Sequence, residues 1–395
     1  MADDDRAAVT PVDVDLADLG LDEGGHLPVA RALARGGAVR VRGDAPTLAV
    51  DLPAWCRARG CAIARAGDAW LIEPSAADRW RGAERAGAID AAVDHPPARW
   101  GLAARGALVE AGAPALDLPL ADKDAVWADE AARLYAQAAA AQWDPATAIP
   151  WDAPAEHPAE VEDAVVQVMT YLIENETAAL LVPTRFLGKL HPHFREVMQL
   201  LAIQIADEAR HVEVFTRRAT LRRGALGLST AGGQASLASL FAEPDFAIAS
   251  FLLSVLGEGS FLALLWFLRD HAPDACTRAV ATLAAQDEAR HVAFGLAHLG
   301  RHCAHDPSLR DRLAAAIERR HAALAHTSGL NAEVFDALVL LAAGGWTSAA
   351  LRRGHAAVVA LATTMDDGRR QRLVRLGFAP ERAAALSGLH TRNFM

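Results

Sequence analysis

The sequence predicts a mainly α-helical protein, in which a helical bundle with extra helices follows a small α+β domain. Short alternating segments and glycine turns mark the first 78 residues, whereas no alternating strand pattern appears after Asp124. Of the 395 residues, 52% are hydrophobic, which is ample for a sizeable core. We expect an α+β domain over 1–78, a linker with short helices over 79–122, a bundle over 123–305, and a C-terminal helical extension packed on the bundle over 306–395.

The charge and cysteine content bound the function. Lys and Arg number 39 against 49 Asp and Glu, and the net charge is -10. An acidic chain does not hold phosphates or anionic lipid over a broad surface, so we expect neither nucleic acid nor membrane as a partner. The four cysteines form no Cys-x-x-Cys pair, and the first residues are acidic where a signal peptide is basic. We therefore expect a cytoplasmic protein.

The first 78 residues read as a strand, a helix and a hairpin. Residues 38–42 alternate like a half-buried strand, and Asp51 can cap a short helix that opens with Pro53 and closes at Gly60. Residues 61–65 and 69–72 flank a Gly-Asp pair, which suits a hairpin.

This stretch resembles the TusA-like sulfur-carrier family. The resemblance covers about a fifth of the chain and rests on Leu19-Gly-Leu21 and on the helix start at 51–56, which reads Asp-Leu-Pro-Ala-Trp-Cys and is followed by Gly60. The family's Cys-Pro-x-Pro persulfide site should follow Leu21, but residues 22–28 contain no cysteine. The domain is therefore a degenerate relative that cannot carry sulfur by the family route. We expect a docking or scaffolding role and interpret Cys56 as a packed small hydrophobe.

Helical periodicity dominates the remainder of the chain. One segment, Phe246–Leu268, is long enough to span a bilayer but carries Glu258 near its centre, where a lone carboxylate in lipid is costly. A helix buried in a bundle suits this composition better. We expect helices over 124–142, 160–182 (ended by Pro183), 194–220, 246–268, 275–303, 308–326, 332–343 and 348–364, a short one near Arg369, and a glycine-rich break over 224–233.

A repeated hexapeptide indicates metal chemistry. Asp-Glu-Ala-Arg-His-Val occupies 207–212 and recurs 80 positions later at 287–292. On a helix, a Glu and a His three apart lie about 60° apart with about 4.5 Å of rise, so Glu208 with His211 and Glu288 with His291 can each reach one ion. A single Glu-x-x-His pair usually lies on a solvent-exposed helix face. Two copies, each after an apolar helix, predict a metal centre.

Two neighbouring cations also need bridging carboxylates, which we expect from one Glu on each of the other two bundle helices. Glu258 lies 30 positions before Glu288 in an apolar helix and meets this requirement. For the first copy, Glu174 and Glu176 both remain candidates. We prefer Glu176 because it shares its helix face with apolar residues, whereas Glu174 shares its face with Gln and Thr.

The region from 124 to 303 resembles the ferritin-like di-iron carboxylate superfamily. It is most similar to the branch of bacterial multicomponent monooxygenases and ribonucleotide reductase small subunits, whose second motif often reads Asp-Glu-x-Arg-His. The resemblance implies a ferritin-like four-helix bundle that binds two iron ions, and mixed carboxylate and imidazole ligation also suits manganese. The implied metal ligands are Glu176, Glu208, His211, Glu258, Glu288 and His291.

The resemblance also implies how these ligands are supported. Asp207 would accept the spare ring N–H of His291, and Asp287 that of His211. Arg210 and Arg290 would point away from the metal face and neutralise buried carboxylates.

Departures from the family narrow the activity. Phe215 stands where the reductase subunit has its radical Tyr, and Leu262 stands where the monooxygenases have a Thr. We expect a non-haem di-iron oxygenase or oxidase that activates O2 and hydroxylates, N-oxygenates or desaturates a small organic substrate. The metal centre would supply the only catalytic groups, and an external electron donor would serve it. Phe215, Phe251, Phe261, Trp266 and Phe294 are candidate pocket residues, and the C-terminal helices are expected to wall the pocket.

Two alternatives remain. The centre could serve a ferroxidase or iron-binding ferritin-like protein without an organic substrate, or the bundle could be a non-catalytic binding platform. A homodimer is compatible with each of these functions.

Overall fold

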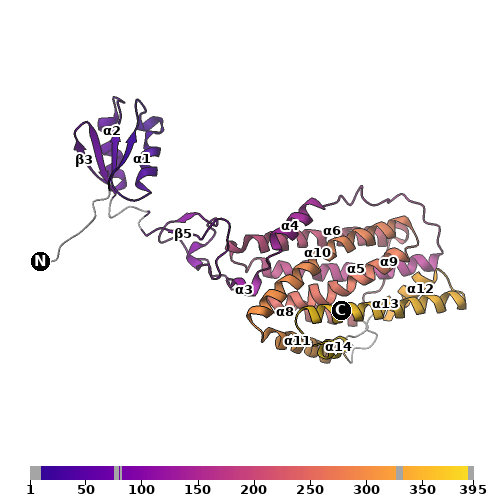
Figure 1. Cartoon of the computed structure of the whole chain (residues 1–395). Coiled ribbons are helices and arrows are strands. Elements are labelled where there is room, and N and C mark those ends of the chain that lie inside the picture. The colour runs from indigo at the N-terminus through magenta and orange to yellow at the C-terminus, as the bar shows by residue number, and fades with distance from the viewer. Residues whose placement is uncertain (1–9, 75–79, 81, 326–331, 390–395) are drawn as a thin grey trace. The chain divides into compact units, whose positions relative to one another are not determined.

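The computed structural model describes residues 10–74, 80, 82–325 and 332–389 (Figure 1). The chain divides into two compact units. The first comprises Met1–Ala91 and Ala98–Leu116, and the second comprises Ala92–Pro97 and Asp117–Met395.

The N-terminal unit contains a four-stranded sheet in the order β1-β2-β4-β3. β1 pairs in parallel with β2, and the other neighbours are antiparallel. Leu52 and Cys56 of α2 and Ile72 of β4 are fully buried in its core. The elements are β1 (Val12–Asp15), the π-helical turn η1 (Leu21–Gly25), α1 (His26–Leu33), β2 (Val39–Arg42), α2 (Leu48–Arg59), β3 (Ala62–Ala66) and β4 (Ala69–Glu73).

The expected strand, helix and hairpin are present in this unit, with two differences. The helix α2 begins at Leu48 after Thr47, so Asp51 lies in its first turn and does not cap it. Gly60 ends α2 with a φ of 68°, a left-handed conformation that glycine adopts without strain. β1 and α1 were not predicted, because Val-Asp-Val-Asp is a four-residue strand and α1 follows a glycine pair.

The expected linker with short helices contains instead a small antiparallel pair of strands. β5 (Glu84–Arg85) pairs with β6 (Leu108–Val109), and η2 (Ala98–Trp100) is a single 3-10 turn between them. The Glu84 carboxylate holds this segment together, since it accepts hydrogen bonds from the Arg99 guanidinium and from Trp100 Nε1 at 3.0 Å.

Four long helices form the bundle of the second unit (Figure 1). They are α5 (Ala159–Leu187), α6 (Arg195–Arg223), the continuous helix made of α8 (Phe246–Ser250), η4 (Phe251–Glu258) and α9 (Gly259–Asp270), and α10 (Ala275–His305). α5 packs along α6, η4 and α9 pack along α10, and α6 also contacts α10. Gly295 lets α10 approach η4 closely, because a Cβ there would lie 2.7 Å from the Cβ of Ser254.

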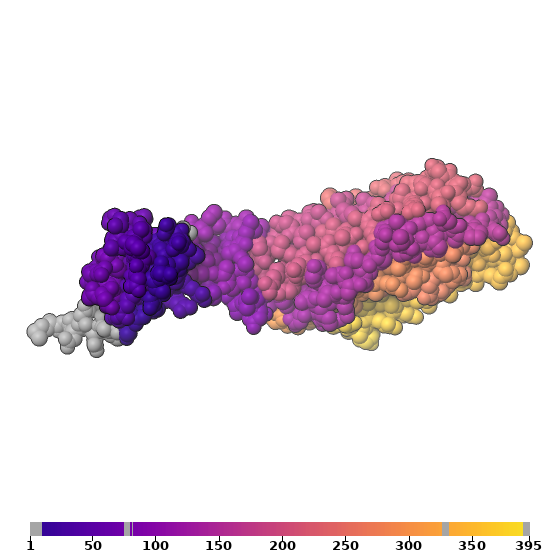
Figure 2. Space-filling view, turned by 90° about the horizontal axis from the view of Figure 1, so that it is seen from above, coloured from indigo at the N-terminus to yellow at the C-terminus, as the bar shows by residue number. Residues whose placement is uncertain are grey.

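The other helices cover this bundle. α4 packs on α6 and α10, α12 on α5, and α13 on α9 and η4. Figure 2 shows one face of the bundle, where α5 and α6 (magenta to pink) lie beside yellow C-terminal helices. The covering elements are α3 (Lys123–Val126), α4 (Ala131–Ala140), η3 (Pro192–Phe194), α7 (Ala231–Phe241), α11 (Leu309–Leu324), α12 (Ala332–Ala343), α13 (Ser348–Arg375) and α14 (Pro380–Gly388).

Several predicted helix bounds were wrong. The stretch 124–142 is two helices, because Trp127 is extended and its indole bonds to the Asp129 carboxylate. α5 continues through Pro183 to Leu187: a proline removes one helical hydrogen bond, but Pro183 is buried in the bundle and packing there holds the helix. α13 runs on to Arg375 and so replaces both the helix expected over 348–364 and the short one expected near Arg369, and α7 and α14 were not predicted. His326, the expected end of α11, lies outside the described residues.

The helix Phe246–Asp270 is apolar and long enough to cross a membrane, but 78% of its most apolar window is buried inside the protein. Its neighbours are α10 and α13. This burial is typical of the core helix of a bundle. α12 and α13, which are bent by 119° at the break between them, are together also long and apolar enough to cross a membrane.

Candidate metal centre

The four bundle helices bring four carboxylates and two imidazoles to one buried cluster. Glu176 comes from α5, Glu208 and His211 from α6, Glu258 from the end of η4, and Glu288 and His291 from α10. Each of the six residues is at most 3% exposed. They form two overlapping groups, each with ligand atoms close enough to hold one ion: Glu176, Glu208, His211 and Glu288 in the first, and Glu208, Glu258, Glu288 and His291 in the second.

Glu208 and Glu288 belong to both groups. Glu208 places Oε2 at 3.3 Å from Nδ1 of His211 and Oε1 at 3.1 Å from Nδ1 of His291. Glu288 does the same from the opposite side, with Oε1 at 3.5 Å from His211 and Oε2 at 3.4 Å from His291. Each of these carboxylates therefore faces both imidazoles, which is the placement of a bridging ligand.

The sequence-based expectation about bridging differs from this geometry. Glu176 and Glu258 were expected to bridge, but each belongs to one group only. The reason is that α6 and α10 face each other across the bundle, so each Glu-x-x-His turn points its Glu between the two imidazoles. Glu176 is buried with its Oε2 at 3.4 Å from His211, whereas Glu174 is only half-buried and belongs to neither group.

The cluster fits two divalent cations. Both oxygens of Glu208 and of Glu288, one oxygen each of Glu176 and Glu258, and Nδ1 of His291 are buried without a hydrogen-bond partner. A buried carboxylate oxygen without a partner is costly, and metal coordination removes that cost. Four carboxylates with neutral imidazoles also carry the negative charge that two divalent cations neutralise.

The pKa values of the cluster residues are shifted by their burial and by the carboxylates around them. Burial, together with the Glu208 carboxylate, raises the pKa of Glu176 to about 8. Burial and the Glu288 carboxylate raise the pKa of Glu258 well above its ordinary value. Burial would lower the pKa of both histidines, but the surrounding carboxylates raise it well above the ordinary value. Like charges this close are unfavourable unless protons or cations compensate them.

A second layer of residues orients the imidazoles. Nε2 of His211 lies 3.1 Å from Oδ2 of Asp287, and Nε2 of His291 lies 3.3 Å from Oδ2 of Asp207. A proton on Nε2 leaves the lone pair of Nδ1 free to bind a cation. Arg210 donates to Asp207 at 2.5 Å and to Asp287 at 2.9 Å, and Arg290 donates to Asp287. These contacts offset the charge of the two buried aspartates.

Three supporting residues were missed from the sequence. Just after α4, Gln142 donates to Asp207 at 2.9 Å and Trp143 Nε1 donates to Asp287 at 2.9 Å. Gln204 donates to Oε1 of Glu258 at 3.2 Å. Gln204 precedes Glu208 by one helical turn, so a polar residue on the ligand face was a usable signal. No sequence pattern connects Gln142 or Trp143 with the repeated hexapeptides.

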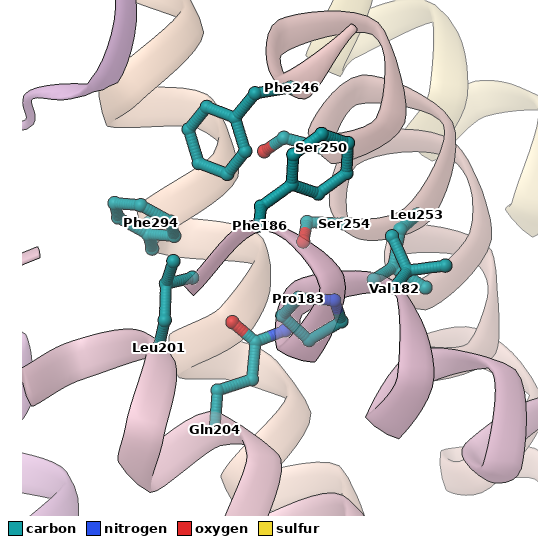
Figure 3. Close-up of a pocket in the computed structure, with 10 residues that line it drawn as sticks. All are labelled: Val182, Pro183, Phe186, Leu201, Gln204, Phe246, Ser250, Leu253, Ser254 and Phe294. Carbon is teal, nitrogen blue, oxygen red and sulfur yellow. The ribbon is translucent and has the colours of Figure 1, made fainter. Parts of the chain in front are cut away.

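Two small pockets lie near the cluster: Gln204, which donates to Glu258, lines the first, and Glu176 and Glu258 themselves line the second. The first has a volume of about 20 Å³, and Figure 3 shows the Gln204 amide and two serine hydroxyls facing the same space as three phenylalanine rings. Its lining residues are Val182, Pro183, Phe186, Leu201, Gln204, Phe246, Ser250, Leu253, Ser254 and Phe294. The second, of about 10 Å³, is lined by Glu176, Glu258 and residues that include Phe261, Leu237 and Leu240.

The pocket residues differ in part from those expected. Phe294 and Phe261 line these pockets, whereas Phe215 and Phe251 are fully buried and line neither. The first pocket is formed by α5, α6, α8, η4 and α10, and the second by α5, α7, η4 and α9, so none of their lining residues comes from the C-terminal helices α11–α14. α12 and α13 instead line a separate surface groove of about 520 Å³.

A third cluster of possible metal ligands is filled by the side chain of Arg218. His157, Glu162 and Asp274 approach one another closely enough to hold an ion. The buried Arg218 guanidinium donates to Glu162 at 2.8 Å and 2.9 Å and to Asp274 at 2.6 Å. Arg218 therefore supplies the cation of this group, which ties α5 and α6 to the start of α10.

His191 and His193, in the turn between α5 and α6, are buried. His193 Nε2 accepts the backbone N–H of Val93 at 3.0 Å, and His191 begins η3. Their role is to pack the turn between α5 and α6, and neither belongs to a metal group.

Comparisons with known proteins show a distant likeness in fold. No family model matches the chain, and no curated protein matches it. Solved structures described as R2-like ligand-binding oxidases do match. A point mutant of that oxidase with an anaerobically reconstituted Mn/Fe cofactor is 20% identical, with a TM-score of 0.47 over 62% of this chain and 92% of that chain. Another mutant with an aerobically reconstituted Mn/Fe cofactor is 18% identical, with a TM-score of 0.44 over 66% and 93% of the two chains.

Proposed function

We propose that this chain is a non-haem di-iron oxidoreductase that activates O2 and oxidises a small apolar organic substrate. The observation that carries the proposal is the buried cluster of four carboxylates and two imidazoles, with unpartnered oxygens, beside an apolar pocket. Carboxylate-rich ligation with imidazole suits iron and also manganese, so metal analysis has to decide between them.

The chain's own residues would fix the geometry of the centre. Glu208 and Glu288 would bridge the two ions. Glu176 and His211 would bind only the first ion, and Glu258 and His291 only the second. Asp207 and Asp287 hold the imidazoles with Nδ1 toward the cluster. When bound, a pair of redox-active ions would supply the electron chemistry for O2 reduction and substrate oxidation.

The pocket of Figure 3 favours an uncharged substrate group. Its walls are mainly apolar, and its polar groups are one amide and two hydroxyls. A buried charge without a partner there would be costly. Its volume of about 20 Å³ admits only a few atoms, so a larger substrate would require neighbouring side chains to move. Hydroxylation, N-oxygenation and desaturation are all compatible with such a group. We further propose an external electron donor, because monooxygenation consumes two electrons beyond those of the substrate.

The N-terminal unit takes no part in this chemistry in our proposal. Cys56 is fully buried, and burial raises the pKa of its thiol to about 11. A thiol of this kind is unreactive. We propose docking or scaffolding for this unit.

Anaerobic loading with Fe(II), followed by exposure to O2, tests the function. We expect about two iron ions per chain and one round of O2 consumption, with turnover only when a substrate and reductant are present. A ferroxidase would instead consume O2 on repeated Fe(II) additions and accumulate ferric mineral. Protein that binds no metal would refute both functions and leave the binding-platform alternative.

A further inference from the structure

Two arginines of α13 hold the helix that carries Glu258. Arg372 Nε donates to the backbone carbonyl of Val255 at 2.7 Å, and Arg369 Nη1 donates to the hydroxyl of Ser260 at 3.1 Å. Val255 lies three residues before Glu258, and Ser260 lies two residues after it. The arginines are three residues apart and so share one face of α13. Glu258 is therefore flanked on both sides by contacts from the C-terminal extension.

Two helical glycines make room for Arg372. A Cβ on Gly259 would lie 2.5 Å from Nε of Arg372, and a Cβ on Gly368 would lie 3.1 Å from its Nη1. A glycine inside a helix costs about 1 kcal/mol relative to alanine. The chain has glycine at both positions, and the close approach of the guanidinium to the helix requires it at Gly259.

The helix is widened at this point. η4 is π-helical from Phe251 to Glu258, and it ends on Glu258 itself. A change between the wide turn and an ordinary α-helical turn would rotate the following side chains by about 100° around the axis. Whether Glu258 points into the cluster therefore depends on the conformation of the turn to which Arg372 donates.

Neither arginine is explained as a member of an ion pair. Within residues 10–74, 80, 82–325 and 332–389, no carboxylate forms a salt bridge with Arg369 or Arg372, and the recorded acceptors are a carbonyl and hydroxyls. Asp366, one of two adjacent aspartates in this part of α13, pairs with Arg370 at 2.6 Å. The buried Arg369 and the partly buried Arg372 thus contribute directional hydrogen bonds to the Glu258 helix.

We propose that Arg372 and Arg369 are positioning residues that keep Glu258 directed at the second metal ion. The C-terminal extension then sets the geometry of one side of the metal centre. This inference depends on Glu258 being a metal ligand, but it does not depend on the reaction that the centre performs.

Anaerobic titration of the full-length metal-free protein with Mn(II), with free Mn(II) followed by EPR, tests the proposal. Glu258 belongs to only one of the two groups. We therefore expect R372M to lower the affinity for one of the two ions by about 10- to 100-fold, which is the usual effect of losing a residue that supports a ligand. The affinity for the other ion should not change. R369M should act in the same direction, and R372K, which keeps a donor, should recover part of the affinity. R370M is the matched control on the same helix, because Arg370 is half-exposed and pairs with Asp366.

The E258A variant separates this inference from the ligand assignment. We expect E258A to lose the same single ion as R372M. If E258A loses one ion but R372M and R369M bind both with wild-type affinity, even at a lowered melting temperature, the arginines are merely structural and the proposal is overturned. If E258A itself binds both ions normally, the ligand assignment fails and the inference fails with it. If R372M does not fold, R369M and R372K are titrated in its place, and wild-type affinity for both ions in these two variants overturns the proposal.

Discussion

The indole N–H of Trp143 donates to Oδ2 of Asp287 at 2.9 Å, and this same oxygen lies 3.1 Å from Nε2 of His211. Arg210 also donates to it, at 2.9 Å, and stacks over the Trp143 ring at 4.5 Å. One carboxylate oxygen thus joins the segment after α4 to α6 and α10. The support of the His211 ring therefore includes one residue, Trp143, that lies outside the four-helix bundle.

This arrangement predicts the effect of D287N. The substitution removes the charged acceptor of His211, so we expect metal affinity to fall by about 10- to 100-fold while the helical content stays unchanged. W143F removes one of the donors to Asp287 and should cause a smaller loss. W266F serves as the control, because Trp266 is half-buried and lines neither pocket beside the cluster. Equal metal affinity in D287N and wild type, measured by competition with a chelator, would show that Asp287 is not a support of the centre.

The sharing of Glu208 and Glu288 between two groups predicts unequal effects of the four carboxylates. E208A and E288A each remove a ligand from both ions, so we expect less than one metal per chain. E176A and E258A each remove a ligand from one ion, and about one metal per chain should remain. Elemental analysis of the purified variants measures this directly. E174A is the control and should keep both ions, since Glu174 belongs to neither group. If all four variants lost metal to the same extent, the shared roles would be wrong.

The helical class of the bundle and the residues of the cluster were accessible from the sequence for a specific reason. Glu-x-x-His spacing is a property of the α-helix, and a doubled copy within apolar helices indicates a buried face. Glu176 was preferred over Glu174 because burial of a helix face can be read from its neighbours. These inferences are local and need no knowledge of how the helices are placed in space.

What could not be predicted depends on tertiary packing. The bridging roles follow from how α6 faces α10, which spacing within each helix does not determine. Trp143 reaches Asp287 across 144 positions, and Arg372 reaches Val255 across 117. α5 continues through Pro183 because its surroundings are buried, although the local preference is for a helix to end there.

The Arg218 network predicts a large effect on stability away from the metal centre. R218M would remove the buried guanidinium that donates to both Glu162 and Asp274, and we expect a loss of about 3–5 kcal/mol in the free energy of unfolding. R222M should cost far less, because Arg222 is more exposed and lies 3.7 Å from Glu162. Urea unfolding of the metal-free proteins measures both, which keeps metal binding out of the comparison. A loss in R218M no larger than in R222M would contradict a stabilising role for the network.

The same network predicts how stability depends on pH. Burial would raise the pKa of Asp274, but hydrogen bonds from the Thr277 N–H and from Arg218 outweigh it and lower the pKa below its ordinary value of 3.8. A lowered pKa in the folded state means that the unfolded state binds the proton first as the pH falls. The stability from ionised Asp274 is therefore complete above about pH 5 and is lost as the pH falls below 3.8 toward the folded value.

D274N isolates this contribution, because Asn retains the N-cap of α10 while removing the charge. We expect wild type to be more stable than D274N by a constant margin from about pH 8 to about pH 5, and the margin to shrink at lower pH. Chemical unfolding of both metal-free proteins at several pH values gives the margin. A margin that grows on acidification would mean that the folded state raises the pKa of Asp274, and the ion pair with Arg218 would then not be the cause of its stabilising effect.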